Sequence, residues 1–156
     1  MRRYNSNYYS MKRLLLLLTL FFAVSTLSAQ EYKVGDIYDV DGKRGVVFEV
    51  SEDGVHGKIV TVAQPTEKMT WHKAMEFGKT LNNGWYIPSL EEMQTLLGAR
   101  EAVGATLQKN GCKAPHFCWT TDEFNVDCAW VLSVRTDSYG GFYKANKFNV
   151  CIISKF

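Results

Sequence analysis

The sequence lacks the residue patterns that mark the commonest catalytic and metal-binding sites. It contains no H-E-x-x-H motif and no Ser-His-Asp arrangement, which argues against a zinc protease or a serine hydrolase. It has no C-x2-C pair, and His116 is the only histidine near its cysteines, so a zinc site is not indicated. Internal repeats, low-complexity linkers and any apolar segment long enough to span a bilayer are also missing after residue 29. These absences leave a single globular domain as the simplest interpretation.

The first 29 residues have the pattern of a secretory signal peptide. Lys12-Arg13 precede an apolar run over residues 14–24, which is shorter than a membrane span and ends in small residues. We expect cleavage near Ala29, with Met11 as an alternative start of translation. No cysteine stands directly after the apolar run, which disfavours a lipid anchor. The sequence therefore predicts an exported protein, located in the periplasm, at the cell surface or in the medium.

Cleavage at this position would reverse the sign of the net charge. The whole chain has 18 basic and 16 acidic residues, whereas residues 30–156 keep 14 basic and all 16 acidic residues, a net charge of −2. No basic cluster remains that would favour nucleic acid or an anionic membrane surface. We expect residues 30–156 to form one domain, with a β-meander over residues 30–64.

All four cysteines lie in the C-terminal third of the chain, and export would favour disulfides over free thiols, metal binding or redox roles. Four cysteines allow three connectivities. We predict one bridge that closes a short loop and a second that ties one strand to the terminal strand. The predicted pairs are Cys112 with Cys118 and Cys128 with Cys151.

The hydrophobic pattern predicts an α+β domain. In the meander, Asp41-Gly42 is a strong signal for a tight hairpin between two strands. The spacing of apolar residues over 70–81 predicts a helix. Ser89 and Glu92 form a capping box at the start of a second helix, which Gly98 interrupts. The strands are expected at residues 37–40, 45–50, 58–62, 117–121, 129–135 and 148–156, with a further short helix at 101–109.

Two loops between the C-terminal strands carry residues that could bind a ligand. Residues 122–127 form an acidic loop, and residues 139–143 read as a Gly-Gly turn flanked by aromatic side chains. Asp122, Glu123, Asn125 and Asp127 supply oxygen ligands for a cation, but a solvated loop explains them equally well, so no metal or other cofactor is predicted.

Several of these segments, taken in order, resemble one known family. They are Gly84-Trp85-Tyr86-Ile87-Pro88-Ser89-Leu90-Glu91-Glu92-Met93, then Cys118-Trp119-Thr120-Thr121-Asp122-Glu123, then Ala129-Trp130, and a last strand with Cys151. This combination resembles the DUF1566 domain, also called the Lcl C-terminal domain, of exported bacterial proteins. The resemblance covers residues 65–156, and the last strand departs from it by lacking the flanking arginines.

The resemblance implies a C-type-lectin-like fold, with two main helices packed on small antiparallel sheets. The leading hypothesis is therefore a noncatalytic exported recognition domain that binds a glycan or a protein through its C-terminal loops. The alternative for each aromatic candidate is a place in the core, and exposure to solvent decides between the two. The candidate ligand-binding residues are Trp119, Asp122, Tyr139, Phe142 and Tyr143.

Two other functions are compatible with the sequence. The first is an enzyme, because formylglycine-generating enzymes share this fold class and use cysteine chemistry, for which Cys112 and Cys118 are the candidates. No general base is evident beside either cysteine. The second is a structural subunit of a surface assembly, which exposed terminal strands would favour.

Overall fold

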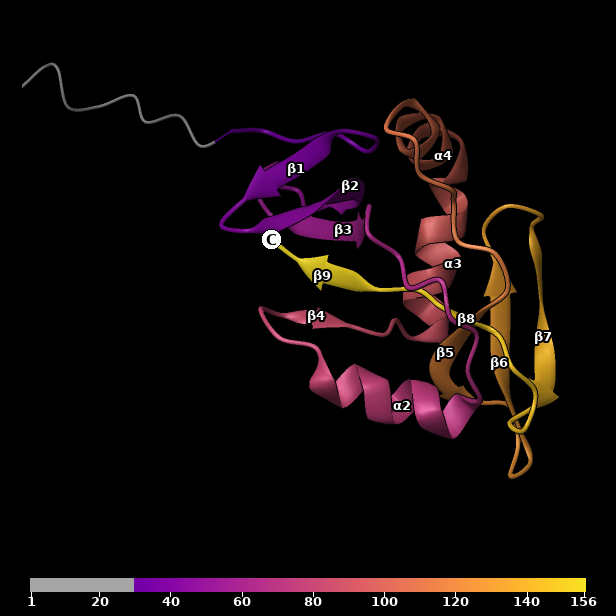
Figure 1. Cartoon of the computed structure of the whole chain (residues 1–156). Coiled ribbons are helices and arrows are strands. Elements are labelled where there is room, and N and C mark those ends of the chain that lie inside the picture. Colours follow the sequence, from indigo (N-terminus) through magenta and orange to yellow (C-terminus); the bar gives the residue numbers. More distant parts are fainter. Residues whose placement is uncertain (1–29) are drawn as a thin grey trace, which may run out of the picture. The chain divides into compact units, whose positions relative to one another are not determined.

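The described residues, 30–156, fold into three helices and two small β-sheets in this computed structural model (Figure 1). Residues 31–156 form one unit. The predicted signal peptide, residues 1–29, lies outside the described residues. The α+β class predicted from the sequence is confirmed.

The first sheet contains the predicted N-terminal meander. Strands β1 (Ile37–Val40), β2 (Lys43–Val50) and β3 (Gly57–Thr61) pair antiparallel in sequence order. The turn between β1 and β2 is formed by Asp41 and Gly42, with φ values of 52° and 75°. Two consecutive positive φ values match a type I′ turn, which explains why an Asp-Gly pair stands there.

The C-terminal strand β9 (Ile153–Lys155) completes this sheet between β3 and the short strand β4 (Trp85–Tyr86). The predicted single strand over 148–156 is thus two strands. Its first part, β8 (Asn149–Val150), belongs to the second sheet, and the chain crosses to the first sheet through Cys151 and Ile152.

The second sheet has the order β7-β6-β5-β8. Its strands are β5 (Cys118–Glu123), β6 (Cys128–Ser133), β7 (Ser138–Tyr143) and β8, and β8 runs parallel to β5. The sequence predicted a turn at residues 139–143, which is wrong: these residues form β7, and the turn lies at residues 134–137. Antiparallel pairing along the whole of β6 holds this Gly-Gly segment extended.

Three helices connect and cover the sheets, namely α2 (Trp71–Thr80), α3 (Leu90–Gly98) and α4 (Arg100–Lys109). Side chains of α3 and α4, including Met93 and Leu107, share the main core with Val60 of the first sheet and Leu132 of the second. Full burial of each such side chain stabilises the fold by roughly 1.5–3 kcal/mol. None of the helices within residues 30–156 has the length and hydrophobicity needed to cross a membrane.

Candidate functional site

One face of β6 and β7 is buried in the main core at Leu132 and carries more exposed aromatic side chains beside it. In the antiparallel register Leu132 lies opposite Tyr139, and Trp130 lies opposite Gly141. Residues directly opposite one another point to the same face, so Trp130 and Tyr139 share one side of the sheet. Tyr143 lies farther along the same face, opposite Cys128. Tyr139 and Tyr143 are 58% and 67% exposed.

Phe124, from the loop between β5 and β6, extends this face. Its ring meets the Trp130 ring edge-on with 4.8 Å between centroids, and the Trp130 and Tyr139 rings are 6.3 Å apart. Phe124 is nevertheless 50% exposed. We call Phe124, Trp130, Tyr139 and Tyr143 the aromatic surface.

Gly141 makes room for Phe124 on this surface. A Cβ atom at position 141 would lie only 2.4 Å from Cγ of Phe124. The loop itself is held by backbone hydrogen bonds, since the N–H groups of Phe124 and Asn125 both donate to the carbonyl oxygen of Cys128. The Asn125 side chain accepts hydrogen bonds from the N–H groups of Asp127 and Cys128. Phe124 therefore has a defined position despite its exposure.

The structure separates the sequence-predicted aromatic candidates into two groups. Tyr139 and Tyr143 are exposed, as a ligand-binding role requires. Trp119 is completely buried, and its indole N–H donates to the carbonyl of Met69 at 2.8 Å. A direct ligand contact by Trp119 was therefore predicted wrongly, because its strand position faces the core.

Phe142 points away from the aromatic surface. It lies opposite Ala129 and packs in the second core cluster, with its ring centroid 5.0 Å from that of Phe148. This placement leaves it largely a core residue, contrary to the predicted ligand contact, because side chains alternate between the faces of a strand.

Asp122 is exposed, and its carboxylate accepts a hydrogen bond of 2.7 Å from the backbone N–H of Leu90. This contact satisfies one of the free N–H groups at the start of α3. A ligand contact by Asp122 stays a prediction.

Trp130 and Phe124 were not among the predicted site residues. Trp130 stands between Ala129 and Val131, so the period-two alternation of the strand would have placed it on the face opposite to theirs. Phe124 had no comparable signal, because its position depends on Gly141 of a different strand.

Three of the four candidate oxygen ligands at residues 122–127, namely Asp122, Glu123 and Asn125, already have partners within the protein. Glu123 pairs with Lys144 at 2.6 Å, and Asn125 caps the loop backbone. Within residues 30–156, no group of three or more His, Cys, Asp or Glu side chains could hold a metal ion. The local contacts account for these polar residues.

All four cysteines are free thiols, in contrast to the two predicted disulfides. Strand β5 lies between β6, which begins at Cys128, and β8, which Cys151 follows. Strands two apart in a sheet are separated by about 10 Å. This exceeds the Cα separation of about 7 Å that a disulfide tolerates, so the Cys128–Cys151 pair was predicted wrongly.

The first predicted pair is also not formed. The Cys118 thiol is buried in the main core, whereas the half-buried Cys112 thiol donates to the carbonyl of Asn110 at 3.4 Å. Burial raises the pKa of the Cys118 thiol to about 12. A thiol with this pKa is protonated near neutral pH and is a poor nucleophile, which argues against enzymatic use of Cys118.

Comparisons with known proteins give a remote likeness to solved structures. No protein-family model matches the chain, and no curated protein matches it. The crystal structure of botrocetin is similar with a TM-score of 0.39 and 16% identity, over 64% of this chain and 90% of that chain. A chain from a complex of botrocetin with the A1 domain of a von Willebrand factor mutant has a TM-score of 0.41 and 12% identity, over 78% of this chain and 97% of that chain.

Both TM-scores lie below 0.5, so no property of these proteins is carried over to this chain. The C-type-lectin-like fold and the DUF1566 relationship stay predictions from the sequence motifs.

Proposed function

We propose that this protein is a noncatalytic recognition domain that binds a glycan or a protein through its aromatic surface. The observation that carries the proposal is the contiguous group on one face of β6 and β7 in which exposed Phe124 and Tyr139 flank the half-buried Trp130. Tyr and Trp dominate the binding energy of many interfaces, because each offers a large rigid surface and a polar atom. Exposed aromatic faces also suit the apolar faces of sugar rings.

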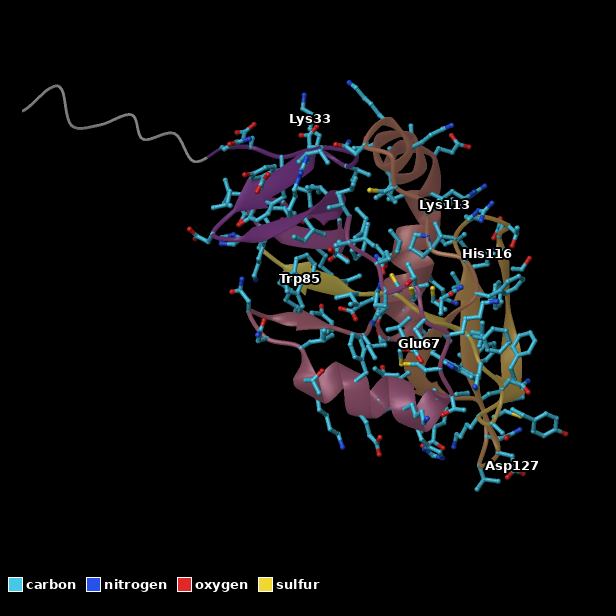
Figure 2. All side chains as sticks on the ribbon, viewed as in Figure 1. Lys33, Glu67, Trp85, Lys113, His116 and Asp127 are labelled. Carbon is cyan, nitrogen blue, oxygen red and sulfur yellow. The ribbon has the colours of Figure 1, made fainter. Side chains whose placement is uncertain are left out.

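The surroundings of the aromatic surface support binding rather than packing within the chain. Val126, in the same loop as Phe124, is 82% exposed. The loop also carries Asp127, which Figure 2 shows at the far end of the β5–β6 connection. Exposed apolar groups with polar residues at their border are typical of surfaces that a partner covers.

We further propose that the domain acts after export and is related to the DUF1566 family. The pattern of residues 1–29 supports export, and the strand, proline and capped helix around residues 84–93 are the parts of the family motif that the sequence carries. The alternative of a structural subunit has support from one terminal strand only: β1 lies at an edge of its sheet, whereas the last strand, β9, lies between two neighbours.

Two alanine variants of the aromatic surface test the proposal. We expect Tyr139→Ala and Tyr143→Ala to keep the thermal melting temperature within about 2 °C, because both side chains are more than half exposed. Binding should fall about tenfold or more. A glycan array and chemical cross-linking to surface proteins of the source cells identify a ligand of either class, and titration calorimetry measures its affinity.

The control is Val34→Ala, which removes another exposed apolar side chain, 43% exposed, that precedes the first sheet. This variant should bind like the unmodified protein. Equal binding by the tyrosine variants, with the fold intact, would rule out the aromatic surface. A large loss of thermal stability in both would show that these tyrosines belong to the core.

A further inference from the structure

A cavity lies in another part of the protein, and none of the residues of the aromatic surface line it. Its volume is about 520 Å³, and four separate parts of the chain line it. The lining residues are 62, 64–66 and 68 before α2, 111–116 and 118 from the end of α4 to the start of β5, Arg135, and 149–150. A cavity of this size can enclose a small molecule.

The charged residues that line the cavity are all basic. They are Lys68, Lys113 and Arg135, and His116 lies among them, whereas no Asp or Glu lines it. Figure 2 shows Lys113 and His116 in the connection that follows α4. The neighbouring Glu67 is exposed and does not line the cavity. The cavity is thus a local concentration of positive charge in a domain that carries net negative charge after residue 29.

These basic side chains are not used by the fold. Within residues 30–156, Lys68, Lys113 and Arg135 take part in no ion pair. The pKa of His116 is lowered by partial burial and by the nearby charges of Arg135 and Lys68. Lys68 and Arg135 therefore act on the same small region, and within residues 30–156 no ion pair offsets their mutual repulsion.

The polar frame of the cavity holds His116 in a fixed position. The ring Nδ1 of His116 is hydrogen-bonded to the hydroxyl oxygen of Ser133 at 2.8 Å. The backbone carbonyl of His116 accepts a hydrogen bond from the side-chain amide of Asn149. The other ring nitrogen, Nε2, makes no hydrogen bond within the described residues. Apolar side chains, including Val62 and Pro115, line the rest of the cavity.

We propose that this cavity binds a small anion through a carboxylate, sulfate or phosphate group that contacts Lys68, His116 and Arg135. An anionic group would neutralise the unpaired charges, and the arginine guanidinium matches the oxygen geometry of all three groups. The apolar part of the lining would contact the body of an organic anion. This site is independent of the aromatic surface and of its ligand.

The test is an NMR titration of the protein with sodium phosphate, sodium sulfate and sodium citrate, each at constant ionic strength set with sodium chloride. We expect saturable shifts of the backbone amide signals of residues 111–118 with at least one of these probes. Arg135→Gln and Lys68→Gln should each weaken that binding about tenfold, the usual loss for one hydrogen bond to a charged group.

Two further variants make the outcome decisive. Lys33→Gln removes an exposed lysine far from the cavity in sequence and should bind the anion normally (Figure 2). Tyr139→Ala should also bind it normally, so failure of the anion site and failure of the aromatic surface are distinguishable. The proposal is overturned if shifts are absent or unsaturable with all three anions. It is equally overturned if folded Arg135→Gln and Lys68→Gln bind as well as the unmodified domain.

Discussion

At the residue scale, the candidate site depends on one glycine. Gly141 lies opposite Trp130, and the absence of a side chain at position 141 lets the Phe124 ring cover that part of the sheet. Phe124 then contacts Trp130, which in turn reaches Tyr139. A small residue at one position thereby allows three aromatic rings from different segments to form one surface.

The first prediction concerns this glycine. Gly141→Ala places a methyl group about 2.4 Å from the Phe124 ring, so Phe124 and its loop must move. We expect the indole N–H signal of Trp130 to shift in NMR spectra, and both ligand binding and the melting temperature to fall, because the clash is with the base of the Phe124 ring. Gly140→Ala is the matched control, because its nearest contact, with Phe142, would be an ordinary 3.6 Å. Equal shifts in both variants would contradict the role of Gly141.

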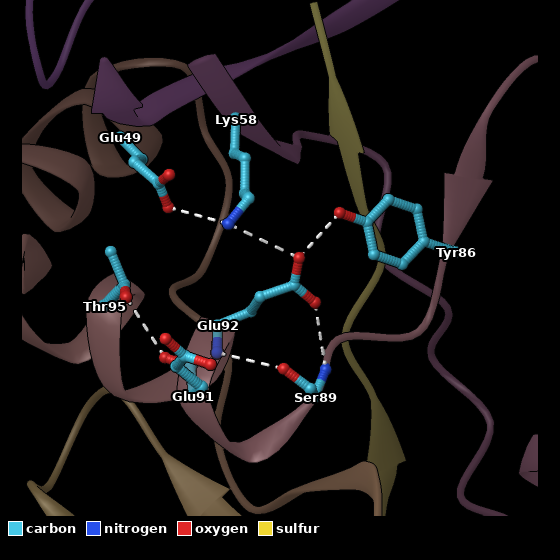
Figure 3. Close-up of polar contacts among 7 residues, drawn as sticks. All are labelled: Glu49, Lys58, Tyr86, Ser89, Glu91, Glu92 and Thr95. Atoms are coloured by element: carbon cyan, nitrogen blue, oxygen red, sulfur yellow. Dashed lines mark hydrogen bonds and ion pairs between the residues drawn. The ribbon is translucent and has the colours of Figure 1, made fainter. Parts of the chain in front are cut away.

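At the element scale, the start of α3 joins local capping to long-range contacts. Ser89 accepts a hydrogen bond from the N–H of Glu92, and Glu92 accepts one from the N–H of Ser89 (Figure 3). The Glu92 carboxylate also accepts a hydrogen bond from the Tyr86 hydroxyl at 2.8 Å and pairs with Lys58 at 3.5 Å. The predicted capping box is confirmed, and its carboxylate also ties α3 to β3 and β4.

The second prediction tests the cap. Ser89→Ala removes the side-chain acceptor for the Glu92 N–H and should lower the free energy of unfolding by about 1 kcal/mol. Urea denaturation measures this change. Ser51→Ala serves as the control, because Ser51 is an exposed turn residue outside any helix. An unchanged midpoint in Ser89→Ala would show that the cap contributes nothing.

The third prediction concerns pH. Burial alone would raise the pKa of Glu92, but hydrogen bonds from Ser89 and Tyr86 and the charge of Lys58 together lower it below its ordinary value of 4.5. A carboxyl group whose pKa is lowered by folding stabilises the folded state above its unfolded pKa. That stabilisation is lost as the pH falls through the lower folded pKa.

Urea midpoints measured from pH 6 to pH 3 should therefore show the effect. Glu92→Gln should be less stable than the unmodified protein at pH 6, and the difference should shrink toward pH 3. Glu91→Gln changes an exposed glutamate of the same helix and is the matched control, with a small difference in stability expected at pH 6. A gap between Glu92→Gln and the unmodified protein that does not narrow at low pH would contradict the assigned pKa shift.

At the scale of the whole molecule, the C-terminal residues join the two sheets. β8 lies at one edge of the second sheet, and β9 lies inside the first, so Cys151 and Ile152 cross between them within the buried interior. Cys118 and Cys151 belong to the same main core, and burial raises the pKa of both thiols. These two thiols are thus buried, whereas Cys112 and Cys128 are partly exposed.

The fourth prediction uses that difference. In the native protein a thiol reagent should label Cys112 and Cys128 quickly, because both are partly exposed, and should label Cys118 and Cys151 only after denaturation. A double variant, Cys112→Ser with Cys128→Ser, should lose the fast reaction and keep two slow thiols. Fewer than four reactive thiols in denaturant without reductant would instead establish a disulfide.

The sequence by itself determined the features that depend on neighbouring residues. The Asp41-Gly42 hairpin, the capping box at Ser89 and the end of α3 at Gly98 all follow from backbone preferences within a few positions. The α+β class follows from the order of such segments.

Only the tertiary structure decided which side chains meet across the sheets. It placed Trp119 in the core, made residues 139–143 a strand and separated Cys128 from Cys151 by β5. It also brought Phe124 to Gly141. These outcomes depend on strand order and register, which are set by the summed burial of distant side chains and are not encoded by any one segment.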